Sequence, residues 1–595
     1  MTERGIMRIL GLARESHDTG VALLDNGRIA LVLEEERHNR EKHTLQFPRH
    51  ALEAALGRDG AGLSSIDRIT TPWDPRRLRR TFAKALLRRF PLSLTLALPS
   101  AHTTQDSGVV LLNFWARHDL KRRFPGQRLP PIVNVGHHES HAAMYFVSPF
   151  DDATVVVMDG YGDDCATSVF TGEANHLERR WHGALFDSLG MVYTLVTRHL
   201  GFEPFEEGTV MALAALGSDS MVDRMRDVVH LAPDGRFTMN MSYFSYDTYG
   251  MLRPFKRKFI DTFGPARRRD EPMTAHHHDL AFALQAMAEE VVVHVVQAAR
   301  RNYPSRNLCF VGGVALNCVA NGRLQRESGF ERIWVPPCAS DTGVPLGSAL
   351  WHHHQTLRAP RGEVMTHAYH GLAYPDTEIE KALREAGLAF ERLDEPRLLD
   401  RVARDLADNR IVGWFQGRYE IGPRALGNRS ILASPTSADV RDLINKRIKF
   451  REPFRPFAPS VLAEKAAEWF EITGPDPFMT QAPRVRPEMA SRIPAAVHVD
   501  GTARIQTVER AANPRYHALI ERFEKLTGVP VLLNTSFNKQ EPIVTRPEEA
   551  ISCFLRTDMH VLVMGDYYVT DRPAAAAERA RMRFEVIEVN TRGGE

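Results

Sequence analysis

The sequence has few cysteines and no motif that pairs them. Its five cysteines are scattered over 595 residues without a CxxC pair. An odd, unpaired set builds no regular disulfide framework and excludes the common cysteine-based zinc and redox motifs. We expect reduced, mostly buried thiols in a cytoplasmic protein.

Long apolar runs and an excess of one charge are also missing. No apolar stretch approaches the length of a membrane span, and residues 1–5 lack the apolar core of a signal peptide. The formal net charge of +2 predicts no general attraction to nucleic acid or to an anionic membrane. We therefore expect a soluble protein of the cytoplasm with neither partner, and a homodimer as the default assembly.

The length of the chain predicts more than one domain. A chain of 595 residues with 43% hydrophobic and 25% charged residues is an ordinary globular composition, but it is too long for a single core. A segment rich in arginine, proline and glycine at 358–364 is the candidate linker. We predict domains at 1–357 and 365–595.

The most distinctive stretch is an arginine-rich loop at 417–430. It holds Arg418, Arg424 and Arg429 with one glutamate, three glycines and a proline. This spacing fits neither an amphipathic helix nor an alternating strand. Guanidinium groups bind phosphate or carboxylate oxygens two at a time, so the loop is suited to a small anion. The alternative is a surface turn with solvated charges.

Three further polar segments lie in the same part of the chain. Residues 445–459 carry cations among prolines, 500–506 form a polar turn, and 534–538 follow the apolar run 529–533. A polar turn at the end of a buried strand is a usual place for ligand contacts. Together with the arginine-rich loop, these segments predict a phosphate-handling site.

The first part of the chain alternates strands and polar loops. Predicted strands at 8–12, 21–24 and 29–33 are joined by a polar loop and by the hairpin signal Asp25-Asn26-Gly27. At fold level this beginning resembles the phosphate-clasping subdomains of actin-like ATPases. Strands at 154–158 and 308–311 each run into a glycine loop. The fold class is therefore predicted as α/β.

A candidate metal site combines two histidines and two aspartates. His137 and His141 are four residues apart, so both rings project from one face of a helix. Asp159 and Asp341 each follow a predicted strand and could add oxygen ligands. This set suits a borderline divalent metal such as Fe²⁺, Mn²⁺ or Zn²⁺. The alternative is a helix start with solvated histidines.

Two other patterns receive plainer interpretations. The triplets 276–278 and 352–354 are three consecutive histidines each, which cannot converge on one ion from a helix, so we predict surface or helix-end histidines. Residues 76–89 hold seven cations and no acidic residue. They predict an amphipathic helix with a basic outer face or, alternatively, an inserted segment that shapes an acceptor pocket.

Taken together, these motifs resemble the O-carbamoyltransferase family of nodulation and antibiotic biosynthesis. The resemblance covers nearly the whole chain, at 17–18, 34–42, 137–141, 159–163, 312–317, 341, 417–430, 445–459 and 534–538. It implies an actin-like ATPase domain, similar to the protein that transfers threonylcarbamoyl to tRNA, followed by a YrdC-like α/β domain. It also implies that carbamoyl phosphate and ATP, with Mg²⁺, give carbamoyl-adenylate, whose carbamoyl group passes to an alcohol.

The resemblance also suggests roles for individual residues. The candidate catalytic residues are His17, Asp18 and Arg424. The candidates for carbamoyl phosphate and ATP are Arg418, Arg424, Lys449, Arg455, Ser536 and Asn538. The candidates for nucleotide in the first domain are Gly160, Gly162, Gly312, Gly313 and Asn317. The metal on His137, His141, Asp159 and Asp341 would be iron(II). His17 or Asp18 would accept the alcohol proton, unless the pair is only a structural turn.

One departure and two alternatives remain open. Relatives usually show a lysine and a glycine where residues 208–212 of this chain have Thr209 and Ala212, which puts the acceptor contacts in question. A tRNA threonylcarbamoyl-type enzyme is one alternative, favoured by the cations at 76–89 and opposed by the low net charge. A nucleotide sensor without turnover is the other. The acceptor would be a hydroxylated small molecule, and its identity is not written in the sequence.

Overall fold

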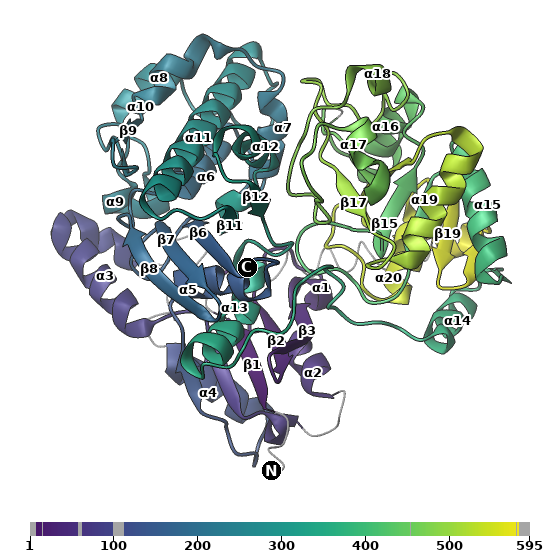
Figure 1. Ribbon diagram of the computed structural model, residues 1–595, viewed down its shortest axis with the longest axis horizontal. Helices are drawn as coiled ribbons and strands as arrows, with labels where there is room; N and C mark the ends of the chain where they lie inside the picture. The colour runs from purple at the N-terminus through teal and green to yellow at the C-terminus, as the bar shows by residue number, and fades with distance from the viewer. Residues whose placement is uncertain are drawn as a thin grey trace. The chain divides into compact units, whose positions relative to one another are not determined.

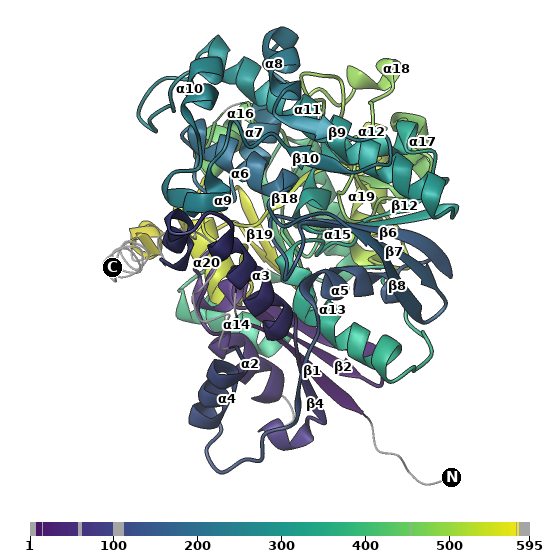
Figure 2. The same cartoon turned by 90° about the vertical axis from the view of Figure 1, so that its left-hand side faces the viewer.

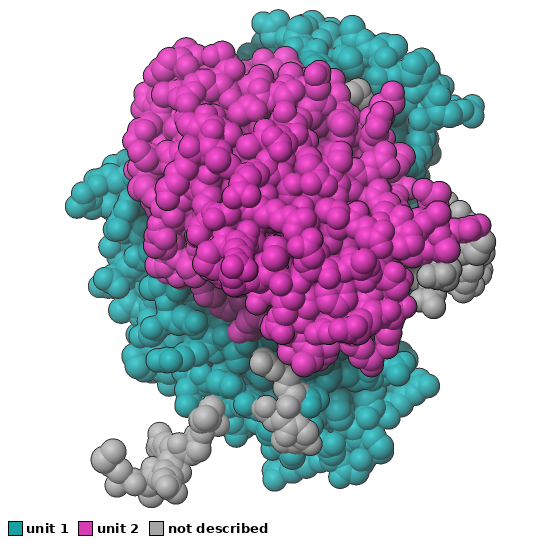
Figure 3. Space-filling view, turned by 90° about the vertical axis from the view of Figure 1, so that its right-hand side faces the viewer, with its two compact units in different colours: residues 1–35, 43–365 teal, residues 36–42, 366–595 magenta. Residues whose placement is uncertain are grey.

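The chain folds into two compact units. The computed structural model describes residues 7–14, 16–57, 62–98, 112–452, 454–578 and 580–581. Unit 1 comprises residues 1–35 and 43–365, and unit 2 comprises residues 36–42 and 366–595 (Figures 1 and 3). The chain thus passes into unit 2 for a short segment, 36–42, long before its second half begins.

Unit 1 contains two five-stranded sheets with the same topology. The first has the order β3-β2-β1-β4-β5 and the second the order β8-β7-β6-β11-β12. In each, the first three strands form an antiparallel meander and the last two run parallel to the first. The strands are β1 Arg8–Ala13, β2 Gly20–Asp25, β3 Arg28–Glu34, β4 Arg68–Thr71, β5 Ile132–Asn134, β6 Asp152–Met158, β7 Thr167–Glu173, β8 His176–His182, β11 Asn307–Val311 and β12 Arg332–Trp334. This duplicated arrangement confirms the α/β prediction and is the one expected of an actin-like ATPase fold.

Helices and a small hairpin complete unit 1. The helices are α2 Arg49–Gly57, α3 Pro75–Arg88, α4 Leu112–Arg123, α5 His137–Ala142, α6 Leu189–His199, α7 Glu207–Ala214, α8 Val222–Arg226, α9 Tyr246–Tyr249, α10 Arg257–Phe263, α11 Ala275–Asn302, α12 Cys318–Glu327 and α13 Val344–Leu350. Strands β9 Val229–Leu231 and β10 Phe237–Met239 form the hairpin. The hairpin signal in the sequence is confirmed at the β2–β3 turn, where Asn26 and Gly27 have positive φ.

Two glycines of unit 1 allow close backbone contacts that position later side chains. A Cβ on Gly347 of α13 would lie 1.8 Å from the carbonyl oxygen of Ser140, so only glycine lets α13 approach α5. Gly312, at φ +94°, would place a Cβ 2.2 Å from the carbonyl oxygen of Met158. This glycine therefore brings the end of β11 against the end of β6.

Unit 2 is built on one eight-stranded mixed sheet. Its order is β13-β20-β19-β14-β15-β18-β16-β17. The strands are β13 Glu391–Arg392, β14 Val412–Phe415, β15 Arg429–Ala433, β16 Ala458–Leu462, β17 Gln506–Val508, β18 Val531–Ser536, β19 Val561–Met564 and β20 Tyr567–Val569. Pro530 precedes β18, which fits the rule that proline does not sit inside a central strand. The likeness of this unit to a YrdC fold stays a prediction.

The helices of unit 2 include one from the first tenth of the chain. They are α1 Glu36–Asn39, α14 Asp376–Glu385, α15 Glu395–Ala407, α16 Ala438–Ile444, α17 Ala466–Trp469, α18 Pro487–Ala490, α19 Pro514–Thr527 and α20 Pro547–Arg556. The segment 36–42 is tied into this unit by hydrogen bonds to carbonyl oxygens. Arg37 donates to Gly422 at 2.6 Å, and Arg40 donates to Ile543 at 2.9 Å.

One sequence expectation is wrong and others are settled. His352, His353 and His354 are buried, not on the surface, because the helix after α13 continues as a wide π-turn, Trp351–Thr356, into the interior of unit 1. The other triplet starts α11, as expected of helix-end histidines. No helix among the described residues is long and apolar enough to cross a membrane. The sequence also predicts a short final strand near the C-terminus, and that segment, after residue 581, lies outside the described residues.

Candidate functional site

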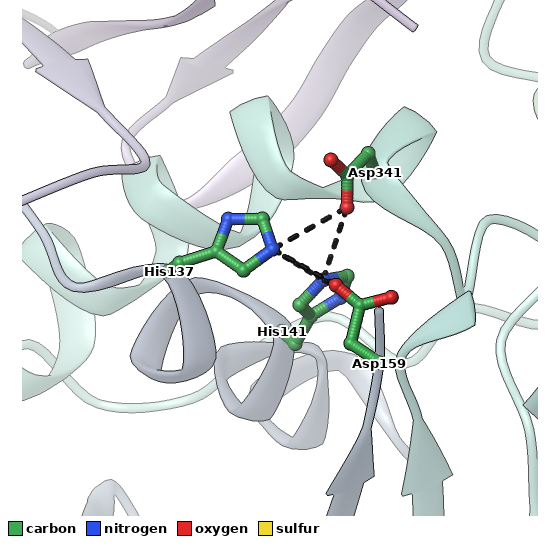
Figure 4. Close-up of side chains that lie close together, drawn as sticks. All are labelled: His137, His141, Asp159 and Asp341. Carbon is green, nitrogen blue, oxygen red and sulfur yellow. Dashed lines mark hydrogen bonds and ion pairs between the residues drawn. The ribbon is translucent and has the colours of Figure 1, made fainter. Parts of the chain in front are cut away.

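The four side chains predicted as metal ligands lie together in unit 1. His137 and His141 come from successive turns of α5, Asp159 follows β6, and Asp341 begins the short 3-10 helix Asp341–Gly343 (Figure 4). Their ligand atoms all lie within 4.8 Å of one another. The Nε2 atoms of the two histidines are 3.2 Å apart, and Asp159 Oδ2 lies 3.1 Å from His137 Nε2. Asp341 Oδ1 lies 3.4 and 3.3 Å from the same two nitrogens.

This donor set fits a divalent transition metal. Two imidazole nitrogens and two carboxylate oxygens aim at one point, and three of the four residues are buried while Asp159 is nearly so. Burial by itself lowers the pKa of His137, but Asp341 and Asp159 outweigh it and hold that pKa well above its ordinary value. Without a metal, protons on the two imidazoles neutralise the two carboxylates. A bound cation would take the place of those protons. Mixed nitrogen and oxygen ligands suit iron, manganese or zinc better than calcium.

Neighbouring groups hold the ligands in place. The backbone N–H of Gly313 donates to Asp159 Oδ1 at 3.0 Å, and the backbone N–H of His137 donates to Asp163 Oδ2 at 2.6 Å. Trp73 stacks on the His137 ring with 4.1 Å between ring centroids. Such outer contacts fix the orientation of ligand side chains. The contacts of Asp163 and Trp73 with His137 could not be predicted from the sequence, because nothing in their spacing relates them to that histidine.

A second cluster adjoins Asp341. His17 Nδ1 lies 2.8 Å from Asp18 Oδ2, and His43 Nδ1 lies 2.8 Å from Asp18 Oδ1. His17 Nε2 lies 3.7 Å from Asp341 Oδ2. Burial lowers the pKa of His17, but Asp18 and Asp341 outweigh it and raise that pKa to about 9. The predicted pair His17 and Asp18 therefore lies beside the metal ligands, and His43 is a third member that the sequence did not reveal.

The backbone around this cluster is unusual. Asp18 and Phe205 are non-glycine residues with φ of +60° and +71°. Phe205 stacks on His43 at 4.1 Å and contacts the His17 ring at 4.6 Å. Left-handed backbone at such residues costs free energy and is concentrated at functional sites. The geometry thus favours a functional loop over a simple structural turn.

The residues predicted to bind nucleotide in unit 1 have defined local contacts. The Gly160 carbonyl accepts a hydrogen bond from Ser188, and a Cβ on Gly162 would collide with His138. Gly313 holds Asp159, as described above. Asn317 caps α12 and exchanges hydrogen bonds with Gln285, so its amide is already engaged. In segment 208–212, where this sequence differs from the family pattern, Thr209 is buried in α7. Nucleotide binding by these residues stays a prediction.

In unit 2 the structure brings three of the predicted anion-binding residues into direct contact. Lys449 Nζ donates to Asn538 Oδ1 at 2.7 Å and lies 3.2 Å from Ser536 Oγ. Burial lowers the pKa of Lys449 well below its ordinary value, and the nearby Arg451 lowers it further. Its hydrogen bonds go to neutral oxygens. The charged form of this lysine is therefore disfavoured by its surroundings, and an anionic ligand would stabilise it.

More cations lie close to Arg451, the neighbour of Lys449. Burial lowers the pKa of Arg451 to about 9, and the positive charges of Arg455 and Arg504 contribute to that shift. The Nε of Arg504 is buried without a hydrogen-bond partner among the described residues. Like charges gathered with so little neutralisation disfavour one another unless an anion is bound. Arg455 was predicted for this site, whereas Arg451 and Arg504 were not.

The arginine-rich loop combines two kinds of arginine. Arg429 is fully buried, donates to the carbonyls of Gln416 and Asn428, and lies over the Phe415 ring at 3.5 Å. Arg418 likewise donates to the carbonyls of Gly371 and His370. Arg424 is only half-buried. The bonds of Arg418 and Arg429 to backbone carbonyls therefore shape the loop, and ligand binding by Arg424 stays a prediction.

Glu420 organises the same loop. One of its carboxylate oxygens accepts hydrogen bonds from the backbone N–H groups of Leu426, Asn428 and Arg429, at 2.8, 2.7 and 3.1 Å. The other oxygen is buried without a hydrogen-bond partner among the described residues. A single carboxylate thus fixes the turn that follows Arg424.

Two protein-family models match the regions of the chain that contain these clusters. A model of the carbamoyltransferase N-terminus matches residues 8–350, and a model of the carbamoyltransferase C-terminus matches residues 403–571. The chain belongs to the carbamoyltransferase family. The four metal-ligand candidates fall in the first matched region, and Arg424, Lys449 and Asn538 fall in the second.

The chain is also similar to individual known proteins. The chain is 38% identical to the uncharacterised protein sll1178 of Synechocystis, over 98% of this chain and 100% of that protein. It is 35% identical to nodulation protein NolNO of Sinorhizobium fredii, over 96% of this chain and 81% of that protein. Component A of (R)-2-hydroxyglutaryl-CoA dehydratase from Acidaminococcus fermentans is a distant structural match, with a TM-score of 0.32 and 13% identity over 59% of this chain and 99% of that one.

Proposed function

We propose that this carbamoyltransferase is an ATP-dependent O-carbamoyltransferase that acts through carbamoyl-adenylate on a hydroxyl group of a small natural product. The observation that carries the proposal is the pair of clusters just described. One unit has ligands arranged for a cation, and the other has buried cations arranged for an anion. A reaction that activates with phosphates and then transfers to an alcohol needs both.

The first step belongs to unit 2. Water releases phosphate from carbamoyl phosphate, and the resulting carbamate oxygen attacks the α-phosphorus of ATP, so that pyrophosphate leaves and carbamoyl-adenylate forms. Two anions must approach each other, so their charge must be neutralised by Mg²⁺ and by cations. Lys449, Arg451 and Arg424 are the cations that we propose for that task. Ser536 and Asn538 hold Lys449 in position.

The second step belongs to unit 1. The alcohol oxygen attacks the carbamoyl carbon, the bond to AMP breaks, and the alcohol proton passes to the protein. We propose iron(II) as the metal held by His137, His141, Asp159 and Asp341. When bound, such an ion polarises the carbamoyl oxygen and makes the carbon a better electrophile. His17 is the candidate proton acceptor, because Asp18 binds its Nδ1 and leaves Nε2 facing the ligand cluster. A cation held by Asp159 and Asp341 would oppose the rise in the His17 pKa that these carboxylates cause, which the base role requires.

A reconstitution assay tests the proposal. The full-length protein is incubated with Mg²⁺-ATP, labelled carbamoyl phosphate, iron(II) and a panel of hydroxylated natural products. We expect release of pyrophosphate and AMP that depends on carbamoyl phosphate, and a labelled carbamate ester of at least one acceptor. Absence of pyrophosphate release would refute activation through an adenylate. Formation of the ester by a preparation that contains Mg²⁺ but no transition metal would refute the metal role.

A further inference from the structure

We infer that unit 1 carries a peripheral docking surface for an anionic lipid bilayer, formed by the exposed residues of α3 and of the segment that follows it. This surface comprises Arg76, Arg79, Arg80, Lys84, Leu87, Arg88, Arg89, Phe90, Leu92, Leu94 and Leu98. It lies outside both clusters of the proposed reaction. Helix α3 faces the viewer in Figure 2.

The exposed face of α3 is basic along its length. Arg76, Arg79, Arg80, Lys84 and Arg88 are all exposed, and their spacing of three or four residues puts them on one side of the helix. None of the first four forms an ion pair with a carboxylate in the part of the chain that the structure describes. The sequence from 75 to 98 contains no acidic residue. Arg88 and Arg89 lie 3.9 and 3.4 Å from Asp247 Oδ2, so the charge that is not neutralised locally is that of the four cations before them.

Apolar side chains project from the same surface. Leu87 is 74% exposed in the middle of the basic face, and Phe90 is 66% exposed just beyond the helix. Leu92, Leu94 and Leu98 continue the exposed apolar series along the 3-10 helix Leu92–Ala97 and its end. Exposed leucine and phenylalanine interspersed with arginine and lysine is the pattern of helices that lie in a membrane interface. The low net charge of the whole chain conceals this local concentration.

The helix is anchored, so the surface is a built feature of unit 1. Asp74 caps α3 by accepting from the Arg76 N–H, and Pro75 occupies the first helical turn. Arg77, the cation of α3 that faces inward, donates to Glu139 of α5 at 2.6 Å. Thr95 donates to the carbonyl of Thr248 at 2.7 Å. The face opposite the exposed cations is thus held against the body of the unit.

Other occupants fit this surface less well. In a two-fold dimer the patch would meet itself, and cations would oppose cations. The phosphates of a nucleic acid would pair with the arginines. Proteins recognise the bases, however, through aromatic stacking and hydrogen bonds, which exposed leucines do not supply. A protein interface gathers its apolar residues in a dry core that is depleted of charge, whereas here Leu87 and Phe90 flank Arg88 and Arg89. A bilayer with anionic headgroups accepts both kinds of side chain at once.

Vesicle flotation with the full-length protein tests the inference. Vesicles of phosphatidylcholine alone are compared with vesicles that also contain phosphatidylglycerol. We expect binding to the anionic vesicles only, weakened as the salt concentration rises from about 0.1 to about 0.5 M. Exchanging Arg76, Arg79, Arg80 and Lys84 together for glutamine should weaken binding by about tenfold or more. A variant that combines Leu87→Ser, Phe90→Ser and Leu92→Ser should also bind the anionic vesicles more weakly. Its binding should depend on salt concentration as that of the wild type does.

A control variant combines Leu526→Ser with Lys381→Gln and Arg257→Gln, which are exposed elsewhere. It should float like the wild type. All variants should keep wild-type thermal unfolding and wild-type pyrophosphate release, since their side chains lie outside the reaction site. Equal loss in the control, or equal binding to neutral vesicles, would overturn the inference. The inference is also wrong if the wild-type protein binds neither kind of vesicle. A salt-sensitive gel shift with RNA would then identify nucleic acid as the occupant.

Discussion

The charged clusters of the two units differ in sign balance, and this difference indicates what each one binds. Around His137 in unit 1, imidazoles face carboxylates, and all four ligand atoms aim at one point. Around Lys449 in unit 2, the cations Arg451 and Lys42 outnumber the one carboxylate, Glu541, and the hydrogen bonds go to neutral oxygens. Burying a charge without a partner is costly, so each cluster implies a ligand of the opposite sign. We propose a metal ion for the first and phosphate-bearing substrates for the second.

The largest effect should come from removing a metal ligand. We expect His137→Ala to lower the rate of carbamoyl transfer at least about a thousandfold, because the metal is no longer held beside the reacting carbon. Carbamoyl phosphate-dependent pyrophosphate release should persist, since that step belongs to unit 2. Metal content by mass spectrometry and both activities are measured, with the exposed His230→Ala as the control. Equal loss of both activities would break the separation of the two clusters.

The reciprocal change lies in unit 2. We expect Lys449→Met, which keeps the length of the side chain, to lower pyrophosphate release about a hundredfold or more because one charge that stabilises the transition state is gone. Metal content should stay at the wild-type level. Lys381→Met, at an exposed lysine, provides the matched control. Normal pyrophosphate release in Lys449→Met would exclude this lysine from activation.

Two arginines of one loop sharpen the comparison within unit 2. Arg429→Met should lower the free energy of unfolding by about 3 kcal/mol, because several buried carbonyls lose their donor. Arg424→Ala should change stability by less than about 1 kcal/mol and should remove pyrophosphate release. Urea unfolding and the release assay distinguish them. If Arg424→Ala is the less stable variant, the division of roles between these arginines is wrong.

The smallest effect concerns a positioning residue in unit 1. His43 reaches the alcohol only through Asp18 and His17, so His43→Ala should lower kcat for transfer about tenfold with little change in KM. His43→Asn, whose amide can still donate to Asp18, should recover part of that loss. Metal content should be normal in both. A change in KM alone, without an effect on kcat, would argue that His43 only shapes a binding surface.

Much of unit 1 was predictable because its signals are local. The β2–β3 hairpin follows from Asp25-Asn26-Gly27, and the pairing of His137 with His141 follows from helical spacing. Other residues were not predictable. His43, Trp73 and Asp163 reach the cluster from separate segments, and no periodicity in the sequence relates them to it. The buried triplet at 352–354 was misjudged because the fold continues a helix into the interior of the unit.

The sequence by itself determined the family, the α/β class and which residue types can serve as ligands, because motifs, strand patterns and helical spacing are properties of short segments. Only the tertiary structure decided how those segments combine. It showed that Arg429 and Arg418 bind backbone carbonyls, that Arg429 is fully buried while Arg424 is half-buried, and that residues 36–42 belong to unit 2. It also showed that Lys449 is buried among cations. These distinctions depend on burial and on partners distant in the sequence, which a chain acquires only on folding.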